Sequence, residues 1–283
     1  MSIVVTAATG QLGRLVVSSL LNRGVDAAQI VATGRSTDRL AAFAPQGVRV
    51  AELDYAKPTD GVINAGDTVL LISGSEVGQR IEQHRNVIEL AQKSGAARIV
   101  YTSVLRADRT TLAIAPEHVA TEQTLKASGV PYTILRNGWY TENYAPAFAQ
   151  AAASGAVITS AGDGRISAAT RQDFAEAAAA VLTGDGHDGA TYELGGDTAF
   201  TMRELADTFT TVLDRPIELH NLSGEEHRAA LLGAGLDQST ADFLVLLDRN
   251  TADGELATDT ADLSRLIGHP TTPVAETVAT WQA

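Results

Sequence analysis

The sequence contains no cysteine, few lysines and no apolar run long enough to cross a membrane. Without cysteine, disulfide bonds, thiolate metal ligands and a cysteine nucleophile are all excluded. The formal net charge of −13 repels phosphate backbones, which argues against a nucleic-acid partner. Because the N-terminus enters an apolar run without a basic leader, we expect a cytoplasmic protein with no membrane span.

Two catalytic signatures are also missing. Standard short-chain dehydrogenases carry a tyrosine four residues before a lysine, and no tyrosine here has that neighbour. Tyr132 has Arg136 at this spacing, but inside a predicted strand. The Gly-x-Ser-x-Gly elbow of the α/β-hydrolases is absent as well. No cluster of histidine, aspartate and glutamate has the spacing of metal ligands, so no metal cofactor is expected.

Short β-branched runs alternate with helical patterns through the first half of the chain. This alternation predicts an α/β fold with a doubly wound parallel sheet and right-handed crossovers. In such a sheet, ligands bind at the carboxyl ends of the strands, and here each predicted strand ends in glycine or polar residues. The expected strands begin at Ile3 and cover residues 30–33, 48–51, 68–72, 98–101 and 132–135.

The pattern changes near residue 140. We expect residues 1–140 to form a dinucleotide-binding domain and residues 141–283 to form a smaller, mostly helical lobe. Some segments of this lobe are expected to return to the core of the first domain. The sequence of this second part predicts a helix over 173–182, a strand over 191–194, and helices that begin at the capping boxes of Thr201 and Ser223.

The first strand ends in the turn Ala7-x-x-Gly10-x-x-Gly13. A strand, a glycine-containing turn and a helix together point the N–H groups of the helix N-terminus at a pyrophosphate. The usual pattern begins with glycine. Alanine there costs little at negative φ, but it excludes positive φ and crowds the pyrophosphate slightly. The alternative is an ordinary strand-to-helix turn that binds nothing.

Polar residues at the next strand ends extend the candidate site. Arg35 and Arg39 stand where NAD-binding proteins usually place an acid, and a guanidinium suits the 2′-phosphate of NADPH. Asp54 either accepts a hydrogen bond from the adenine amino group or is a turn residue. The small residues 73–75 either let the backbone approach the nicotinamide ribose or form a plain loop.

A histidine on the predicted helix 116–128 is the candidate proton donor. His118 lies near the binding edge and is placed to protonate a reduced carbonyl oxygen. In the alternative, Glu122 pairs with Lys126 on a solvated face and His118 is a surface residue. His84 lies on the apolar stripe of another helix, which favours a hydrogen-bonded core histidine.

Aromatic side chains gather after the sixth predicted strand, although aromatic residues make up only 5% of the chain. Trp139, Tyr140 and Tyr144 follow Gly138 closely. They form either a wall on which a flat substrate stacks, or packing between the two parts of the chain.

Several segments along nearly the whole chain carry a family resemblance. They are residues 6–13 (TAATGQLG), 71–80 (LISGSEVGQR), 84–88 (HRNVI), 135–144 (LRNGWYTENY), 161–164, 169–171 and 266–272. They resemble the NmrA-like atypical short-chain dehydrogenases, most of all the bacterial NAD(P)H:quinone oxidoreductases of type 2, with triphenylmethane reductases as near relatives. The block 135–144 is the most specific. Ala7 departs from the pattern, because the family usually has glycine there.

The resemblance implies a Rossmann domain with a small C-terminal lobe and a substrate cleft between them. It also implies NADPH as cofactor, without flavin or metal, and the family likewise lacks the tyrosine–lysine pair. We therefore predict an oxidoreductase that reduces quinones or similar flat electrophiles by direct hydride transfer. The alternatives are a non-enzymatic redox sensor and a reductase of triphenylmethane dyes or of a carbonyl metabolite. The expected partners are the flat substrate and, in a homodimer, a second copy of the chain.

The motifs and the resemblance together give two groups of candidate residues. Asn137, Asn143 or His118 would hydrogen-bond the oxyanion that develops on the substrate. The catalytic candidates are His118, Asn137, Tyr140 and Asn143. The cofactor-binding candidates are Ala7, Ala8, Thr9, Gly10, Gln11, Leu12, Gly13, Arg35, Asp54, Ile72, Ser73, Gly74, Ser75, Arg136, Asn137, Gly138, Trp139, Tyr140 and Thr141.

Overall fold

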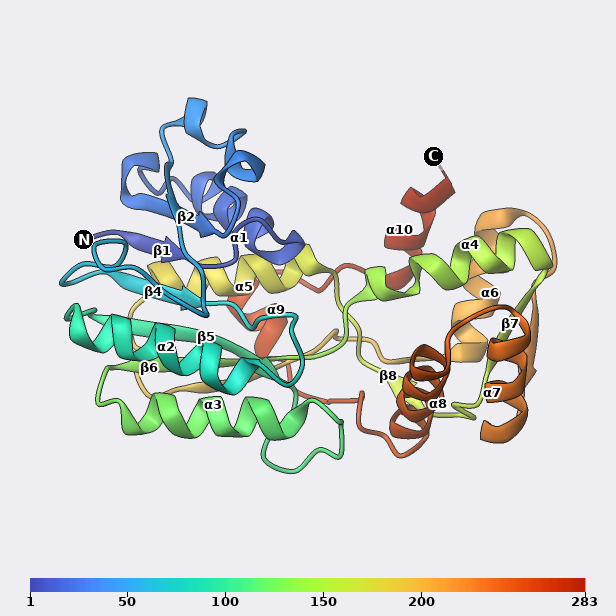
Figure 1. Cartoon of the computed structure of the whole chain (residues 1–283). Helices are drawn as coiled ribbons and strands as arrows, with labels where there is room; N and C mark the ends of the chain where they lie inside the picture. Colours follow the sequence, from blue (N-terminus) through green and yellow to red (C-terminus); the bar gives the residue numbers. More distant parts are fainter. Residues whose placement is uncertain (283) are drawn as a thin grey trace.

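A seven-stranded parallel sheet organises one part of the molecule in the computed structural model, which describes residues 1–282 (Figure 1). The strand order is β3-β2-β1-β4-β5-β6-β9, so the direction of winding reverses beside β1. Such a reversal leaves a crevice at the carboxyl ends of the strands. The strands are β1 (Ile3–Val5), β2 (Ile30–Gly34), β3 (Arg49–Glu52), β4 (Thr68–Leu71), β5 (Arg98–Val104), β6 (Tyr132–Asn137) and β9 (Thr191–Leu194).

Helices cover both faces of this sheet, as the alternation of side chains along β1 illustrates. Val5 belongs to the core under α1, α5 and α9, whereas Val4 belongs to the core under α2 and α3. The predicted doubly wound fold is therefore confirmed. The covering helices are α1 (Gln11–Asn22), α2 (Arg80–Lys93), α3 (Ala115–Ala127), α5 (Arg171–Thr183) and α9 (Asp262–Ile267).

The other helices and short strands form a second part with its own apolar core, on the right of Figure 1. Phe148 and Phe209 meet edge to face in this core, with ring centroids 5.2 Å apart. The predicted capping boxes at Thr201 and Ser223 are present. The helices are α4 (Ala145–Ser154), α6 (Met202–Leu213), α7 (Gly224–Gly233), α8 (Gln238–Ala252) and α10 (Val274–Ala279); the paired strands are β7 (Ala156–Thr159) with β11 (Glu218–Asn221) and β8 (Arg165–Ile166) with β10 (Phe200–Thr201).

The second half of the chain differs from the sequence expectation in its short strands. The pairs β7–β11 and β8–β10 were not predicted, because two to four residues are too few to show a period. The predicted strand 191–194 is confirmed as β9, at the edge of the main sheet beside β6. A domain boundary at residue 140 stays a prediction. Among the helices of residues 1–282, none combines the length and apolarity that a membrane span requires.

Candidate functional site

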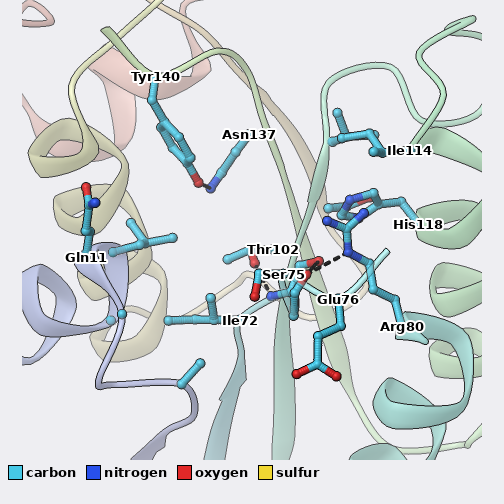
Figure 2. Close-up of a pocket in the computed structure, with 18 of the residues that line it drawn as sticks. Gln11, Ile72, Ser75, Glu76, Arg80, Thr102, Ile114, His118, Asn137 and Tyr140 are labelled. Carbon is cyan, nitrogen blue, oxygen red and sulfur yellow. Dashed lines mark hydrogen bonds between the residues drawn. The ribbon is translucent and has the colours of Figure 1, made fainter. Parts of the chain in front are cut away.

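A cavity of about 620 Å³ opens at the carboxyl ends of β1, β2, β4, β5 and β6 and reaches α8 of the second part. In Figure 2, Gln11 and Tyr140 face Ile114 and His118 across the cavity, with Asn137 between them. The predicted site residues that line it are Ala7, Thr9, Gly10, Gln11, Leu12, Gly13, Arg35, Asp54, Ile72, Ser73, Gly74, Ser75, His118, Asn137, Gly138, Trp139, Tyr140 and Asn143.

The turn after β1 has a backbone conformation that we did not expect from alanine. Ala7 has φ = +47°, in the left-handed region, so the expectation that alanine excludes positive φ is wrong. The turn is fixed by hydrogen bonds, because Gly10 N–H donates to Ala7 O at 2.9 Å and Ala8 N–H donates to Thr33 O at 2.7 Å. A Cβ on Gly13 would lie 2.6 Å from Ala7 O, so α1 starts this close to the turn only with glycine there.

Charged side chains gather where β2, β3 and the loop after β4 border the cavity. Arg35 Nη1 lies 2.7 Å from Glu76 Oε1, and Arg39 and Asp54 line the same cavity. Asp54 also accepts a hydrogen bond from Ala56 N–H at 3.0 Å. Asp54 therefore closes a turn and also lines the cavity.

The loop after β4 is held by side chains of α2. Gly74 N–H donates to His84 Nε2 at 2.9 Å, and Gly74 O accepts from Arg80 Nε at 2.6 Å. Because Nε2 accepts a hydrogen bond, the imidazole proton is on Nδ1, which lies 3.0 Å from Thr121 Oγ1 on α3. Both polar groups of the Gly74 backbone are thus fixed by one helix.

His84 is buried and neutral. Burial is the main cause that lowers its pKa to about 3, and His118 and Arg80 add to the effect. Both ring nitrogens have partners, which confirms the interpretation of His84 as a core histidine.

Asn137 and Tyr140 line the cavity, and Figure 2 shows their polar ends pointing toward each other. Asn137 Nδ2 lies 3.5 Å from Tyr140 OH, and Asn137 Oδ1 is buried without a hydrogen-bond partner in residues 1–282. An unpartnered buried amide oxygen is costly, so it marks a place for a donor of a ligand.

Arg171 supports this group from the start of α5. Its guanidinium lies 4.5 Å from the centroid of the Tyr140 ring, and Nη2 donates to Asn143 Oδ1 at 2.8 Å. The contact fixes the amide of Asn143 and leaves Nδ2 as its donor. Burial raises the pKa of Tyr140, so its phenol keeps its proton.

His118 is 4% exposed, so the alternative that placed it on the surface is wrong. Its Nδ1 lies 2.8 Å from the hydroxyl of Tyr101, whose pKa burial raises. Burial, with a contribution from Arg80, lowers the pKa of His118 to about 3. The imidazole is therefore neutral at neutral pH, and it can donate a hydrogen bond but carries no extra proton for general acid catalysis.

Three predicted cofactor residues lie outside the cavity lining, so their contacts with the cofactor stay predictions. Ala8 and Thr141 are fully buried behind it. Arg136 is the third, because its guanidinium is occupied by carboxylates elsewhere.

Arg136 is buried and forms the centre of an ion-pair network. Its Nε and Nη2 bind the two oxygens of Glu122 at 2.9 and 2.8 Å, and its Nη1 lies 2.8 Å from both Asp108 and Glu193. Lys126 is more distant from Glu122, at 3.7 Å. The structure thus gives Arg136 a positioning role between β6 and α3, and Glu122 is buried rather than on a solvated face.

The predicted aromatic wall is divided between the cavity and the second core. Trp139 and Tyr140 line the cavity. Tyr144 packs edge to face on Phe200, with ring centroids 5.9 Å apart, in the core of the second part. The stacking interpretation therefore keeps two of its three residues.

Sequence reasoning missed the apolar wall on the side of the second part. A signal was present in α8, since five successive apolar residues, 243–247, exceed the width of one helical stripe. Phe243 and Leu246 are 49% and 39% exposed and face the cavity mouth. The missed apolar residues are Leu112, Ala113 and Ile114 before α3, Phe243, Leu246 and Leu247 on α8, and Leu256; the polar Asn250 of α8 lines the same side.

Comparison with known proteins assigns the family. The model of a family described as NAD(P)H-binding matches residues 7–185. The chain belongs to this NAD(P)H-binding family. Quinone oxidoreductase 2 of Escherichia coli (strain K12) is 46% identical over 98% of this chain and 97% of its own length.

Two solved structures resemble this chain over nearly its whole length. The E. coli NADPH-dependent quinone oxidoreductase QOR2, complexed with NADPH, has 45% identity and a TM-score of 0.93, covering 99% of this chain and 100% of its own. The Citrobacter sp. triphenylmethane reductase, complexed with NADP(H), has 35% identity and a TM-score of 0.92, with the same coverage. The predicted resemblance and the Rossmann-like fold are both confirmed.

The first turn has features that fit the cofactor of the NAD(P)H-binding family. Helix α1 has Gly10 as its N-cap, without a capping side chain, and has no acid in its first turn, so its N-terminal N–H groups are available to an anion. Gly13 gives the close approach that such a turn needs. Within residues 1–282, no three histidine, aspartate or glutamate side chains come together as a metal site would require.

Proposed function

We propose that this protein is an NADPH-dependent oxidoreductase that reduces quinones or similar flat electrophiles by direct hydride transfer, without flavin or metal. The observation that carries the proposal is a single cavity that joins the turn before α1 to an apolar chamber. The similarity to E. coli quinone oxidoreductase 2 along the full length supports the same activity. A cytoplasmic location and a homodimer stay predictions from the sequence.

Different residues along the cavity would bind different parts of the cofactor. The N–H groups at the start of α1 would bind the pyrophosphate, and Arg35 would bind the 2′-phosphate. The backbone of residues 73–75, fixed by His84 and Arg80, would border the nicotinamide ribose. Asn137 Oδ1 would accept a hydrogen bond from the nicotinamide carboxamide. When bound, NADPH supplies a hydride from its nicotinamide ring.

The residues beyond the nicotinamide position act mainly by holding the acceptor. Trp139 and the apolar side chains of α8 would stack and enclose a flat ring, which excludes water and brings it to reacting distance. Neutral His118 and the amide of Asn143 would donate hydrogen bonds to the oxygen that gains charge. A hydroquinone anion takes its proton from water, so no strong general acid is required.

Steady-state kinetics test the proposal. Purified protein is mixed with NADPH and each of several small quinones, and the absorbance of the reduced cofactor is followed against a protein-free control. We expect protein-dependent oxidation of NADPH with several quinones. Tight NADPH binding without turnover on the whole panel would instead indicate a redox sensor.

A reductase of triphenylmethane dyes is the second candidate. The fold similarity to the Citrobacter enzyme favours it, with a TM-score of 0.92 over 99% of this chain. Adding a triphenylmethane dye to the same panel separates the two activities. Quinones should be reduced with the higher kcat/KM if the first proposal holds.

A further inference from the structure

An ion pair crosses the cavity border at the end where we place the 2′-phosphate. Arg35 follows β2 and Glu76 lies in the loop after β4, and the two side chains meet at 2.7 Å. Both line the cavity. Glu76 is therefore already bound to the guanidinium that an incoming phosphate needs.

Glu76 is held in this position from a second side. Gln83 Nε2 on α2 donates to Glu76 Oε2 at 2.8 Å, so the carboxylate has one oxygen on each partner. These hydrogen bonds, that of Gln83 first and that of Arg35 second, lower the pKa of Glu76. The carboxylate is thus charged at neutral pH and fixed beside Arg35, and Asp54 adds a second negative charge at this end of the cavity.

We propose that Glu76 competes with the cofactor 2′-phosphate for Arg35 and so limits the selectivity of this protein for NADPH over NADH. This inference rests on the proposed function, and it adds a residue that sets cofactor choice. Binding a 2′-phosphate requires that Arg35 exchange a carboxylate for the phosphate, while Glu76 stays nearby as a like charge. A nucleotide with a 2′-hydroxyl needs no exchange at Arg35 and is not repelled by Glu76.

The effect should be modest because the pair is open to solvent. The Arg35 and Glu76 side chains are 65% and 41% exposed, and exposed pairs are weak. Removing the charge of Glu76 should therefore strengthen binding of a 2′-phosphorylated nucleotide by about two- to fivefold. Binding of a nucleotide without that phosphate should not change.

Isothermal titration calorimetry of the full chain tests this without turnover. The ligands are adenosine 2′,5′-bisphosphate and 5′-AMP, followed by NADPH and NADH. The variants are Glu76→Gln, Arg35→Gln and their double variant. Glu82→Gln is the matched control, because Glu82 is an exposed acid on α2 outside the cavity lining. Thermal unfolding of each variant checks that it is folded.

The proposal predicts tighter binding of the bisphosphate to Glu76→Gln, no change for 5′-AMP, and no change in Glu82→Gln. In the Arg35→Gln background, Glu76→Gln should give a smaller gain, because competition for Arg35 is then absent and only the like-charge repulsion by Glu76 is relieved. Equal affinities of Glu76→Gln and wild type overturn the inference, as does an equal gain in Glu82→Gln or weaker binding of both ligands to Glu76→Gln. If wild type binds none of the four nucleotides, the proposed function fails and the inference with it.

Discussion

Ala7 has a backbone conformation that its side chain disfavours. Its φ of +47° places Cβ close to the carbonyl that follows, at a cost of about 1 kcal/mol for a residue other than glycine. The turn persists because Gly10 and Thr33 fix it through hydrogen bonds. Glycine at this position would adopt the conformation without strain.

Ala7→Gly should raise the free energy of unfolding by up to about 1 kcal/mol, because released strain exceeds the entropy cost of glycine. Ala8→Gly is the control, since Ala8 is buried and has no positive φ. It should lower the free energy of unfolding. Urea denaturation measures both, and equal losses in the two variants would contradict the strain at Ala7.

His84 is one of two α2 side chains that fix the loop bordering the nicotinamide end. Truncation in His84→Ala leaves the partly buried Gly74 N–H without its acceptor, so the loop should lose its fixed position. We expect the Kd for NADPH to rise roughly tenfold, while the Kd for adenosine 2′,5′-bisphosphate stays unchanged. Fluorescence titration of the two ligands gives this comparison.

Two further variants separate loop positioning from general instability. His84→Gln keeps an acceptor and should recover part of the NADPH affinity. His220→Ala removes an exposed imidazole on β11 and should bind both ligands as wild type does. Equal losses for NADPH and the bisphosphate in His84→Ala would show that the helix is merely destabilised.

Helix α8 forms the side of the cavity that comes from the second part of the chain. Its residue Phe243 keeps 49% of its surface exposed at the cavity mouth, so a substrate ring can cover it. Phe243→Ala should raise KM for large apolar quinones roughly three- to tenfold. KM for NADPH should not change.

The control for α8 is Leu232→Ala on α7, an exposed apolar residue outside the cavity lining. It should leave every kinetic constant unchanged. If Phe243→Ala affects small and large quinones alike, α8 does not contact the part of the substrate that varies in size.

The whole molecule should become less stable in acid because it buries two neutral imidazoles. The pKa values of His84 and His118 fall from 6.5 to about 3 on folding, mainly through burial and then through the charge of Arg80 and, for His84, the neighbouring His118. The folded state therefore binds fewer protons than the unfolded chain between these pH values. The free energy of unfolding should fall as the pH drops below about 6.5, by about 2 kcal/mol for each imidazole at pH 5.

Urea denaturation at neutral pH and at about pH 5 measures this loss of stability. His84→Gln should lose less stability on acidification than wild type, because one titrating group is removed. An identical loss in His84→Gln would show that this imidazole is not the proton acceptor.

The central sheet and the first turn were predictable because their signals are local. The β-branched runs give β1 to β6, and Gly10 and Gly13 mark the turn at β1. The ion pairs of Arg136 were not predictable in the same way. Sequence spacing does not show that Glu193, 57 residues later, lies beside its guanidinium. The same holds for Phe243, whose role depends on how α8 packs against a sheet far away in the sequence. Long-range packing therefore decided which predicted residues reach the cavity.

Hydride transfer from bound NADPH to a quinone can be measured in a single turnover. Protein saturated with NADPH that carries deuterium on one face or the other of nicotinamide C4 is mixed rapidly with a small quinone. We predict oxidation much faster than without protein, and slower with deuterium on one face only, because the cavity holds the ring in one orientation. Oxidation at the protein-free rate, with NADPH still tightly bound, would contradict the account.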